Sequence, residues 1–188
     1  MLAYLLWHTP AGADTVDYER GLGAFHRALA ATPPAGFVTS WTLCVDQPAW
    51  LPDGAAHYVD WYMVETFAAL GALNDAAVSG ARRAPHDVVA ALARTGTAGL
   101  VGLVGGDTAG RGAPEVRLLG LLDKPAGRSY DAFRSALARA AAGTPGTTCW
   151  MRQMTLGPGP EFMVVAGGTL PALPAPVTAL GATVVATP

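Results

Sequence analysis

Almost no lysine, no isoleucine and only two cysteines occur in this sequence. Its cationic residues are eleven arginines and Lys124, and its formal net charge is −2. Nucleic-acid binding depends on a basic surface that displaces counterions from the phosphate backbone, so neither DNA nor RNA is an expected partner. Cys44 and Cys149 are too few for a disulfide framework, and two buried free thiols are the simpler expectation. The scarcity of lysine and isoleucine is typical of a GC-rich bacterial genome and carries no functional message.

Long hydrophobic runs are also missing. Although 51% of the residues are hydrophobic, glycine, proline and polar residues interrupt them, and no run approaches the roughly 20 residues that a membrane-spanning helix needs. The short apolar run at residues 2–8 has no basic leader and no small-residue cleavage site, so a secretory signal is not expected. We therefore expect a folded, soluble, cytoplasmic protein without a membrane partner.

The first 106 residues predict the order strand, helix, strand, strand, helix, strand. Residues 2–8 and 37–45 are rich in aromatic and β-branched residues, as strands are. A helix is expected between them, because apolar positions recur at helical spacing from Val16 onward. The remaining elements are expected to be a strand at 57–65, a helix capped by Thr66 that ends near 79, a polar connector at 81–85, a short helix at about 86–94 with Pro85 near its first turn, and a strand at 100–104.

The chain then begins a similar order again. Pro125-Ala126-Gly127 follows an apolar strand at 115–122, as Pro10-Ala11-Gly12 follows the first strand. Trp150 lies in a predicted strand at 148–156 as Trp41 lies in the strand at 37–45, and residues 161–166 parallel residues 60–65. Prolines after residue 170 would prevent a long second helix, so this copy is shortened. We expect an N-terminal half at 1–106, a Gly-rich linker at 107–114 and a C-terminal half at 115–188.

The repeated Pro-Ala-Gly, the aromatic strand at 37–45 and the acidic, aromatic strand at 57–65 resemble the dimeric α/β-barrel superfamily. The resemblance implies an α+β fold in which two ferredoxin-like βαββαβ halves in tandem place their antiparallel sheets face to face as an α/β barrel. The superfamily includes cofactor-independent monooxygenases, isomerases, dehydratases, stress-responsive barrels and haem enzymes of the chlorite dismutase type. Haem is disfavoured, because the axial histidine would lie in the C-terminal repeat and all four histidines precede residue 105.

A first candidate ligand-binding site is the polar segment 79–87. Arg82, Arg83 and His86 lie beside a predicted helix N-terminus, where guanidinium groups and the helix dipole hold carboxylates or phosphates. The alternative is that both arginines are solvated loop residues and that Asp87 helps to cap the helix.

A second candidate is the strand at 57–65. His57 is the candidate catalytic residue, because an imidazole serves as a general base near neutral pH, and Trp61 is a candidate ligand contact. His57 and Asp60 are three residues apart and therefore lie on opposite faces of the strand. The alternative is a hydrogen-bonded or surface histidine, and core packing explains the five tryptophans more simply than a ligand cage.

These observations give two functional hypotheses. The first is a small-molecule protein with a cavity inside the barrel, without a metal or other cofactor, resembling monooxygenases or isomerases that act on an apolar or aromatic acid. No paired His/Cys motif has the spacing of a metal site. The second is a non-enzymatic structural or oligomerisation module whose aromatic sheet faces form an interface. Whether the protein is an enzyme and whether it forms a homodimer both stay open.

Overall fold

The computed structural model describes residues 1–12, 14–106 and 115–188. The expected linker at 107–114 lies outside the described residues. The N-terminal half, residues 1–106, contains β1 (Leu2–Pro10), α1 (Thr15–Ala31), β2 (Phe37–Val45), β3 (His57–Val64), α2 (Phe67–Ala77), α3 (Gly80–Leu92) and β4 (Ala93–Gly106). The C-terminal half, residues 115–188, contains β5 (Leu118–Leu122), α4 (Tyr130–Ala142), β6 (Thr147–Thr155), β7 (Phe162–Ala166) and β8 (Thr178–Ala186).

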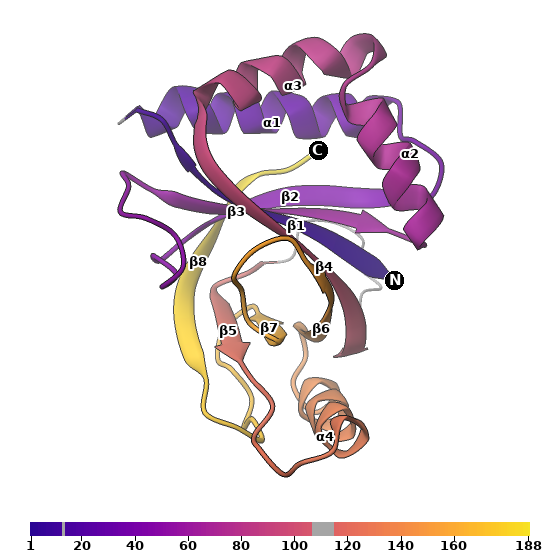
Figure 1. Ribbon diagram of the computed structural model, residues 1–188, viewed down its shortest axis with the longest axis vertical. Helices are drawn as coiled ribbons and strands as arrows, with labels where there is room; N and C mark the ends of the chain where they lie inside the picture. The colour runs from indigo at the N-terminus through magenta and orange to yellow at the C-terminus, as the bar shows by residue number, and fades with distance from the viewer. Residues whose placement is uncertain (13, 107–114) are drawn as a thin grey trace.

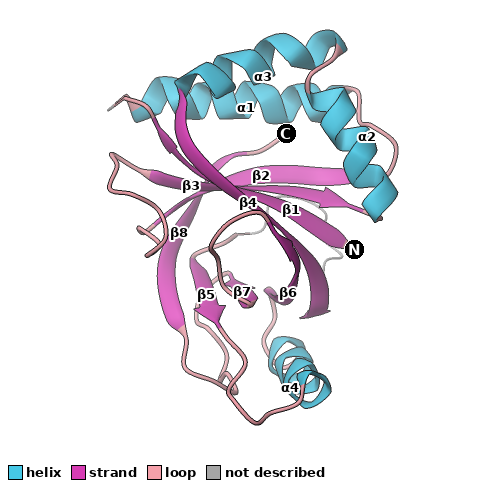
Figure 2. Ribbon diagram, viewed as in Figure 1, coloured by secondary structure: helices cyan, strands magenta, loops and turns pink. Residues whose placement is uncertain are grey.

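The strands form one closed antiparallel barrel (Figures 1 and 2). The N-terminal half contributes the order β4-β1-β3-β2, and the C-terminal half contributes the same kind of order, β8-β5-β7-β6. The two sheets join where β2 pairs with β8 and where β4 pairs with β6. Closure leaves no sheet edge in the barrel to recruit another strand. The α+β barrel predicted from the sequence is therefore confirmed.

Short polar side chains begin three of the helices, as their sequences predict. The Asp14 carboxylate accepts hydrogen bonds from the backbone N–H groups of Val16 and Asp17 at the start of α1. Thr66 caps α2, and Ser129 caps α4 in the same way. Each cap satisfies backbone donors that the first helical turn leaves without a partner, and so fixes where the helix begins.

Two element boundaries differ from the sequence prediction by more than five residues. α3 begins at Gly80 and includes the expected connector at 81–85, so Pro85 lies inside the helix and not near its first turn. A proline removes one helical hydrogen bond, and packing against α1 outweighs that loss. β4 begins at residue 93 rather than 100, because β1 pairs with its Gly-rich start as far as Pro10 opposite Ala93.

Alternation along the strands separates the inside of the barrel from its outside. The interior is packed by apolar side chains from both halves, including Trp7, Trp41, Trp61, Trp150 and Met163. Helices α1, α2 and α3 lie over the outer face of the N-terminal sheet, at the top of Figure 1, whereas α4 lies at the opposite end. Leu170 and Leu173 add a loop segment to the apolar cover of the C-terminal sheet.

Among the described residues, none of the helices has the length and apolar character that crossing a membrane requires.

Candidate functional site

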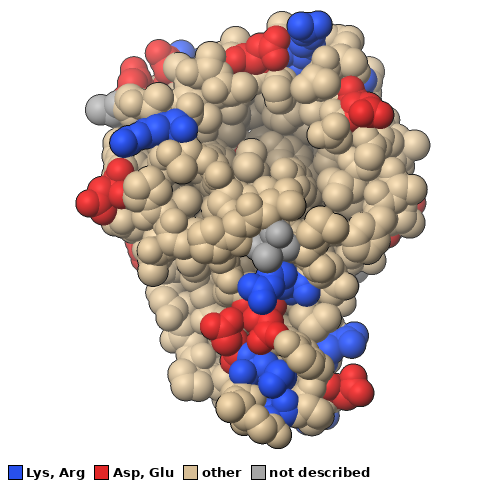
Figure 3. All heavy atoms as spheres, viewed as in Figure 1, with Lys and Arg blue, Asp and Glu red and all other residues tan. Residues whose placement is uncertain are grey.

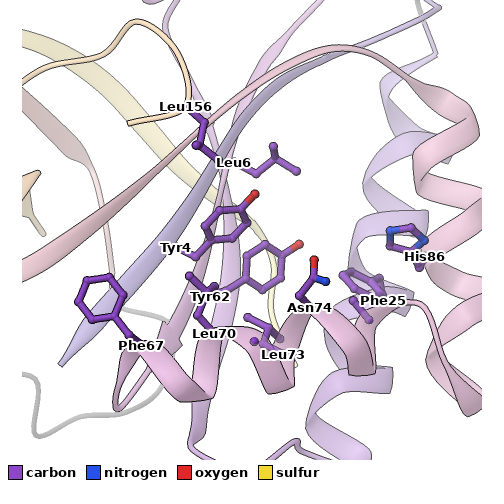
Figure 4. A pocket seen from close by; sticks show the side chains of 12 residues that line it. Tyr4, Leu6, Phe25, Tyr62, Phe67, Leu70, Leu73, Asn74, His86 and Leu156 are labelled. Atoms are coloured by element: carbon purple, nitrogen blue, oxygen red, sulfur yellow. The ribbon is translucent and has the colours of Figure 1, made fainter. Parts of the chain in front are cut away.

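A pocket of about 540 Å³ lies on the outer face of the N-terminal sheet, between strands β1 and β3 and helices α2 and α3 (Figure 4). Figure 3 shows this face hollowed beneath α3, with mainly uncharged atoms around the hollow. The volume is within the range of small-molecule sites. The lining is mostly apolar or aromatic and comprises Tyr4, Leu6, Phe25, Tyr62, Phe67, Leu70, Gly71, Leu73, Asn74, Ala77, His86 and Leu156.

Two tyrosines bring hydroxyl groups to the pocket, whose other polar lining residues are Asn74 and His86. Tyr4 on β1 and Tyr62 on β3 are directly opposite each other in the antiparallel ladder, and their ring centroids are 6.3 Å apart. Figure 4 shows both hydroxyl groups pointing the same way. The Tyr62 hydroxyl donates a hydrogen bond to Oδ2 of Asp60 at 3.0 Å. The Tyr62 oxygen therefore keeps lone pairs that can accept a further hydrogen bond.

Asp60 is the centre of a buried polar network behind Tyr62. Asp60 is 2% exposed, yet each oxygen of its carboxylate has a polar neighbour. The Thr42 hydroxyl donates to Oδ1 at 2.5 Å, and Nε2 of His8 lies 3.3 Å from Oδ2. Nε2 of His26 lies 3.7 Å from Oδ1. A buried carboxylate is tolerated only when it is paired in this way.

The hydrogen-bond pattern fixes which nitrogen of His26 carries a proton. Its Nε2 lies 2.8 Å from the Thr42 hydroxyl oxygen, and its Nδ1 lies 2.6 Å from the Ser40 hydroxyl. Thr42 has a single hydroxyl hydrogen, which it donates to Asp60, so it must accept from His26. Nε2 of His26 is therefore the donor. His8 is held separately, because its Nδ1 lies 2.6 Å from the Tyr18 hydroxyl.

The network places a negative charge behind the tyrosines. Burial alone would raise the pKa of Asp60, but the charge of His8 and the contact with His26 hold it well below its usual value of 3.8. Burial raises the pKa of Tyr62 well above 10.0, and the charge of Asp60 raises it further. Burial and Asp60 also raise the pKa of Tyr4. Both phenols are consequently neutral, and the carboxylate is ionised.

His57 and Trp61 lie on the other face of the same strand. His57 is buried, and its Nε2–H donates to the Pro52 carbonyl at 3.0 Å, which ties the β2–β3 loop to the strand. Trp61 stacks on Trp41 inside the barrel, with ring centroids 6.0 Å apart. Neither residue lines the pocket described above, so the catalytic role of His57 and the ligand contact of Trp61 stay predictions.

The polar segment 79–87 contributes one residue to the pocket. His86 lines it, and its ring meets Phe25 edge-on at 5.6 Å. Arg82 instead donates to the Ala76 and Thr32 carbonyls at 2.8 and 2.6 Å, and so joins the ends of α2 and α1. Arg83 is exposed and lies 3.6 Å from the Asp87 carboxylate, one turn along α3. The structure therefore does not bring the two arginines together with His86, and Asp87 lies within the helix rather than at its start.

Sequence reasoning missed most of this site. His8 and His26 belong to no local motif, so the sequence does not connect them with Asp60. The available signal was the alternation of β3, which places Tyr58, Asp60 and Tyr62 on one face. Three polar or aromatic residues at alternate positions, on the strand face that helices cover, indicate a functional face rather than a purely hydrophobic core.

The histidines do not fit the haem arrangement of the superfamily. The sequence has four histidines, all in the N-terminal half. His8 and His26 are engaged with Asp60, and His57 is bonded to Pro52. No axial ligand is therefore available where the resemblance requires one. Within the part of the chain that the structure describes, no three His, Cys, Asp or Glu side chains are grouped as metal ligands.

No protein-family model and no curated protein match the sequence. Solved structures do match the fold. A "putative monooxygenase" from Lactobacillus acidophilus superposes with a TM-score of 0.57 at 12% identity, covering 99% of this chain and 94% of that one. An "anthrone oxidase-like protein" gives a TM-score of 0.53 at 10% identity, with coverages of 100% and 92%. A "putative chlorite dismutase" gives 0.51 at 11% identity, with coverages of 97% and 94%. These neighbours have the dimeric α/β-barrel fold, and the present chain shares that fold.

Proposed function

We propose that this protein is a small-molecule enzyme whose site is the pocket at Tyr4 and Tyr62, and that it acts on a mainly apolar, aromatic ligand bearing a hydroxyl group. One observation carries this proposal: the Tyr62 hydroxyl at the pocket is hydrogen-bonded to a buried carboxylate. That bond turns the Tyr62 oxygen into an acceptor facing the pocket. Aromatic side chains around it supply the apolar contact area that an aromatic ligand buries.

The charge distribution favours a neutral ligand over the aromatic acid that the sequence led us to expect. Among the described residues, no lysine or arginine lines the pocket. The nearest buried charge is the negative one of Asp60, which already raises the pKa values of Tyr4 and Tyr62. A ligand carboxylate would lie near that charge without a lysine or arginine in the lining to compensate it, at a considerable cost. A hydroxyl group would donate to Tyr62 without this cost.

The chemistry that we propose begins with polarisation of the ligand hydroxyl. The ligand hydroxyl donates to the Tyr62 oxygen while Tyr62 donates to Oδ2 of Asp60, so the carboxylate raises the electron density on the ligand oxygen through Tyr62. Asp60 stays ionised, because His8, 3.3 Å from the same oxygen, and His26 hold its pKa below 3.8. Cofactor-independent oxygenation and isomerisation of aromatic compounds both start from such an activated ligand. In an oxygenation, dioxygen would be the oxidant.

The fold neighbours support an enzyme by analogy only, because a barrel of this kind hosts many functions. Two of their names refer to oxidation of small molecules. The alternative, a structural or oligomerisation module, has less support: the barrel closes within one chain, and its aromatic interior faces already contact each other.

The test compares 2-naphthol with 2-naphthoate by titration calorimetry. We expect the neutral naphthol to bind and the carboxylate to bind at least tenfold more weakly. Tyr62→Phe should weaken naphthol binding by about tenfold, the value of one hydrogen bond of roughly 1.4 kcal/mol. Tyr130→Phe is the matched control, since this tyrosine is 51% exposed on α4. Equal binding of both probes, or no effect of Tyr62→Phe, would contradict the proposal.

Turnover is measured on the same variants. Dioxygen uptake reports oxygenation, and exchange of ring hydrogens for deuterium, followed by NMR, reports proton removal from the activated ligand. We expect Tyr62→Phe to reduce whichever signal the wild type gives by about 10²-fold, because it removes the hydroxyl that polarises and positions the ligand. Wild-type protein that binds naphthols but gives neither signal would be a binding protein rather than an enzyme.

A further inference from the structure

The pocket has two exposed apolar residues at its margin, one from each half of the chain. Phe67, the first residue of α2, is 55% exposed, and Leu156, just after β6, is 66% exposed. Both line the pocket. Figure 4 shows Leu156 next to Leu6, with Tyr4 between these two leucines and Phe67. A ligand that filled the pocket would cover both exposed side chains.

The loop that carries Leu156 is fixed to the N-terminal half. The Leu156 N–H donates to the Ala98 carbonyl of β4 at 2.8 Å. The next residue, Gly157, packs so closely on Thr97 that an added Cβ would overlap the threonine hydroxyl oxygen. Farther along, Arg152 donates from Nη1 to the Gly159 carbonyl at 3.1 Å. These contacts hold Leu156 in one place above the pocket.

We propose that Leu156 determines ligand specificity. Through this residue the C-terminal half supplies the wall of the pocket against which an apolar extension of the ligand packs. The inference rests on the proposed function, since it places the ligand hydroxyl at Tyr62. It narrows the ligand class to neutral hydroxyaromatic compounds with an apolar extension that reaches from the hydroxyl-bearing ring to Leu156. The pairing of β4 with β6, which ends at Gly99 opposite Thr155, brings this wall to the site.

The physical effect is the burial of apolar surface by the ligand. Each methylene group that packs against Leu156 leaves water and raises the affinity roughly fourfold. A short ligand that stays between Tyr62 and Tyr4 gains nothing from Leu156. Removing the leucine side chain should therefore weaken long ligands selectively, which a general loss of stability would not do.

The experiment titrates 4-ethylphenol, 4-butylphenol and 4-octylphenol into the full chain by calorimetry. In the wild type, affinity should rise with alkyl length. Leu156→Ala should weaken 4-octylphenol about tenfold and leave 4-ethylphenol unchanged, as expected for lost contacts in an apolar pocket. Val88→Ala is the matched control, because Val88 is 54% exposed on α3 and does not line the pocket. It should change neither affinity.

Three results separate the possible failures. Equal losses for short and long phenols in Leu156→Ala, or no loss for either, would overturn the role of Leu156 while leaving the proposed function intact. Absence of binding by every alkylphenol to the wild type would overturn the proposed function, and the inference with it. Gly157→Ala gives a second variant: by displacing the loop it should reproduce the selective loss of 4-octylphenol, with circular dichroism checking that the barrel is folded.

Discussion

The outer faces of the two halves carry different chemistry on the same strand order. Equivalent positions can be counted from the first pair of each ladder, Leu2 opposite Val64 and Leu118 opposite Ala166. The pair Tyr4–Tyr62 then corresponds to Gly120–Val164, and the pair Leu6–Asp60 corresponds to Leu122–Phe162. Polar side chains on the N-terminal sheet thus stand where the C-terminal sheet has apolar ones.

The neighbouring strands continue this contrast. Ser40 and Thr42, opposite Tyr62 and Asp60, correspond to Cys149 and Met151, opposite Val164 and Phe162. The two halves also differ in how side chains fill the space over these positions. A Cβ added at Gly120 would lie 3.0 Å from Val177 and 3.2 Å from Leu170, so side chains already fill the position that matches Tyr4. The C-terminal face is packed at the position that matches Tyr4, whereas the N-terminal face keeps a pocket there.

The difference indicates what the polar face is for. Hydrophobic packing at these positions is compatible with the fold, since the C-terminal half has it. A buried carboxylate with two imidazoles contributes less to stability than well-packed apolar residues of similar volume. Local departures from the best packing are expected at functional sites. The polar network is therefore better explained by chemistry at Tyr62 than by stability.

The largest effect should come from removing the charge at the centre of the network. Asp60→Ala removes the carboxylate that accepts from the Thr42 and Tyr62 hydroxyls and that lies beside two buried imidazoles, so we expect the free energy of unfolding to fall by about 3–5 kcal/mol. Asp123→Ala in the C-terminal half is the matched control. That exposed aspartate accepts only the Glu161 N–H among the described residues, and its loss should cost less than about 1 kcal/mol.

Urea unfolding followed by tryptophan fluorescence measures both variants. If Asp60→Ala cost no more than Asp123→Ala, the contrast between a polar network and a packed core would lose its energetic basis.

Much of the fold could be predicted from the sequence. Alternation along the strands and the stop signals between elements predicted the order of strands and helices, and the resemblance to the dimeric α/β-barrel superfamily implied the barrel. Trp150 does take the ladder position of Trp41. The match of residues 161–166 to 60–65 was wrong by one residue, because it aligned Glu161 with Asp60, whereas the ladder aligns Phe162 with Asp60. A shift of one residue exchanges the two faces of a strand. This one-residue error concealed the contrast between the outer faces of the two halves.

The site was harder to predict because it joins residues from separate elements. His8 is on β1, His26 on α1, Thr42 on β2 and Asp60 on β3, and no local spacing connects them. Leu156 comes from the other half of the chain, where nothing in the sequence relates it to Tyr62. Pairing of β4 with β6 creates that proximity, and such long-range pairing leaves no local pattern. His86 could be named as a candidate because it is polar and close to a cluster of charges, and it lines the pocket.

The next effect in size concerns acid. Because the folded protein holds the pKa of Asp60 below 3.8, the unfolded chain binds a proton there that the folded protein does not. The stabilisation that ionised Asp60 provides is therefore complete above about pH 4 and is lost as the pH falls further. The free energy of unfolding then falls by up to about 1.4 kcal/mol per pH unit. Urea midpoints between pH 6 and pH 2.5 should show this slope in the wild type.

Asp60→Asn is the comparison, since the amide does not titrate. Its stability should depend less steeply on pH over the same acid range, because only the other carboxylates contribute. Identical pH profiles for the two proteins would mean that Asp60 is not held ionised by its neighbours. The inference of a negative charge behind the tyrosines would then be wrong.

The smallest effect should come from the outer end of the network. Ser40→Ala removes the hydroxyl that lies 2.6 Å from Nδ1 of His26, so we expect the free energy of unfolding to fall by about 1 kcal/mol. Ser135→Ala, on the exposed side of α4, should stay within about 0.5 kcal/mol of the wild type. Naphthol affinity should not change in either variant, because the Ser40 hydroxyl is hydrogen-bonded to His26, whereas the Tyr62 hydroxyl is hydrogen-bonded to Oδ2 of Asp60. If Ser40→Ala weakened naphthol binding as much as Tyr62→Phe, the His26 side of the network would be part of the ligand chemistry, and the division between a supporting Oδ1 side and a reactive Oδ2 side would not hold.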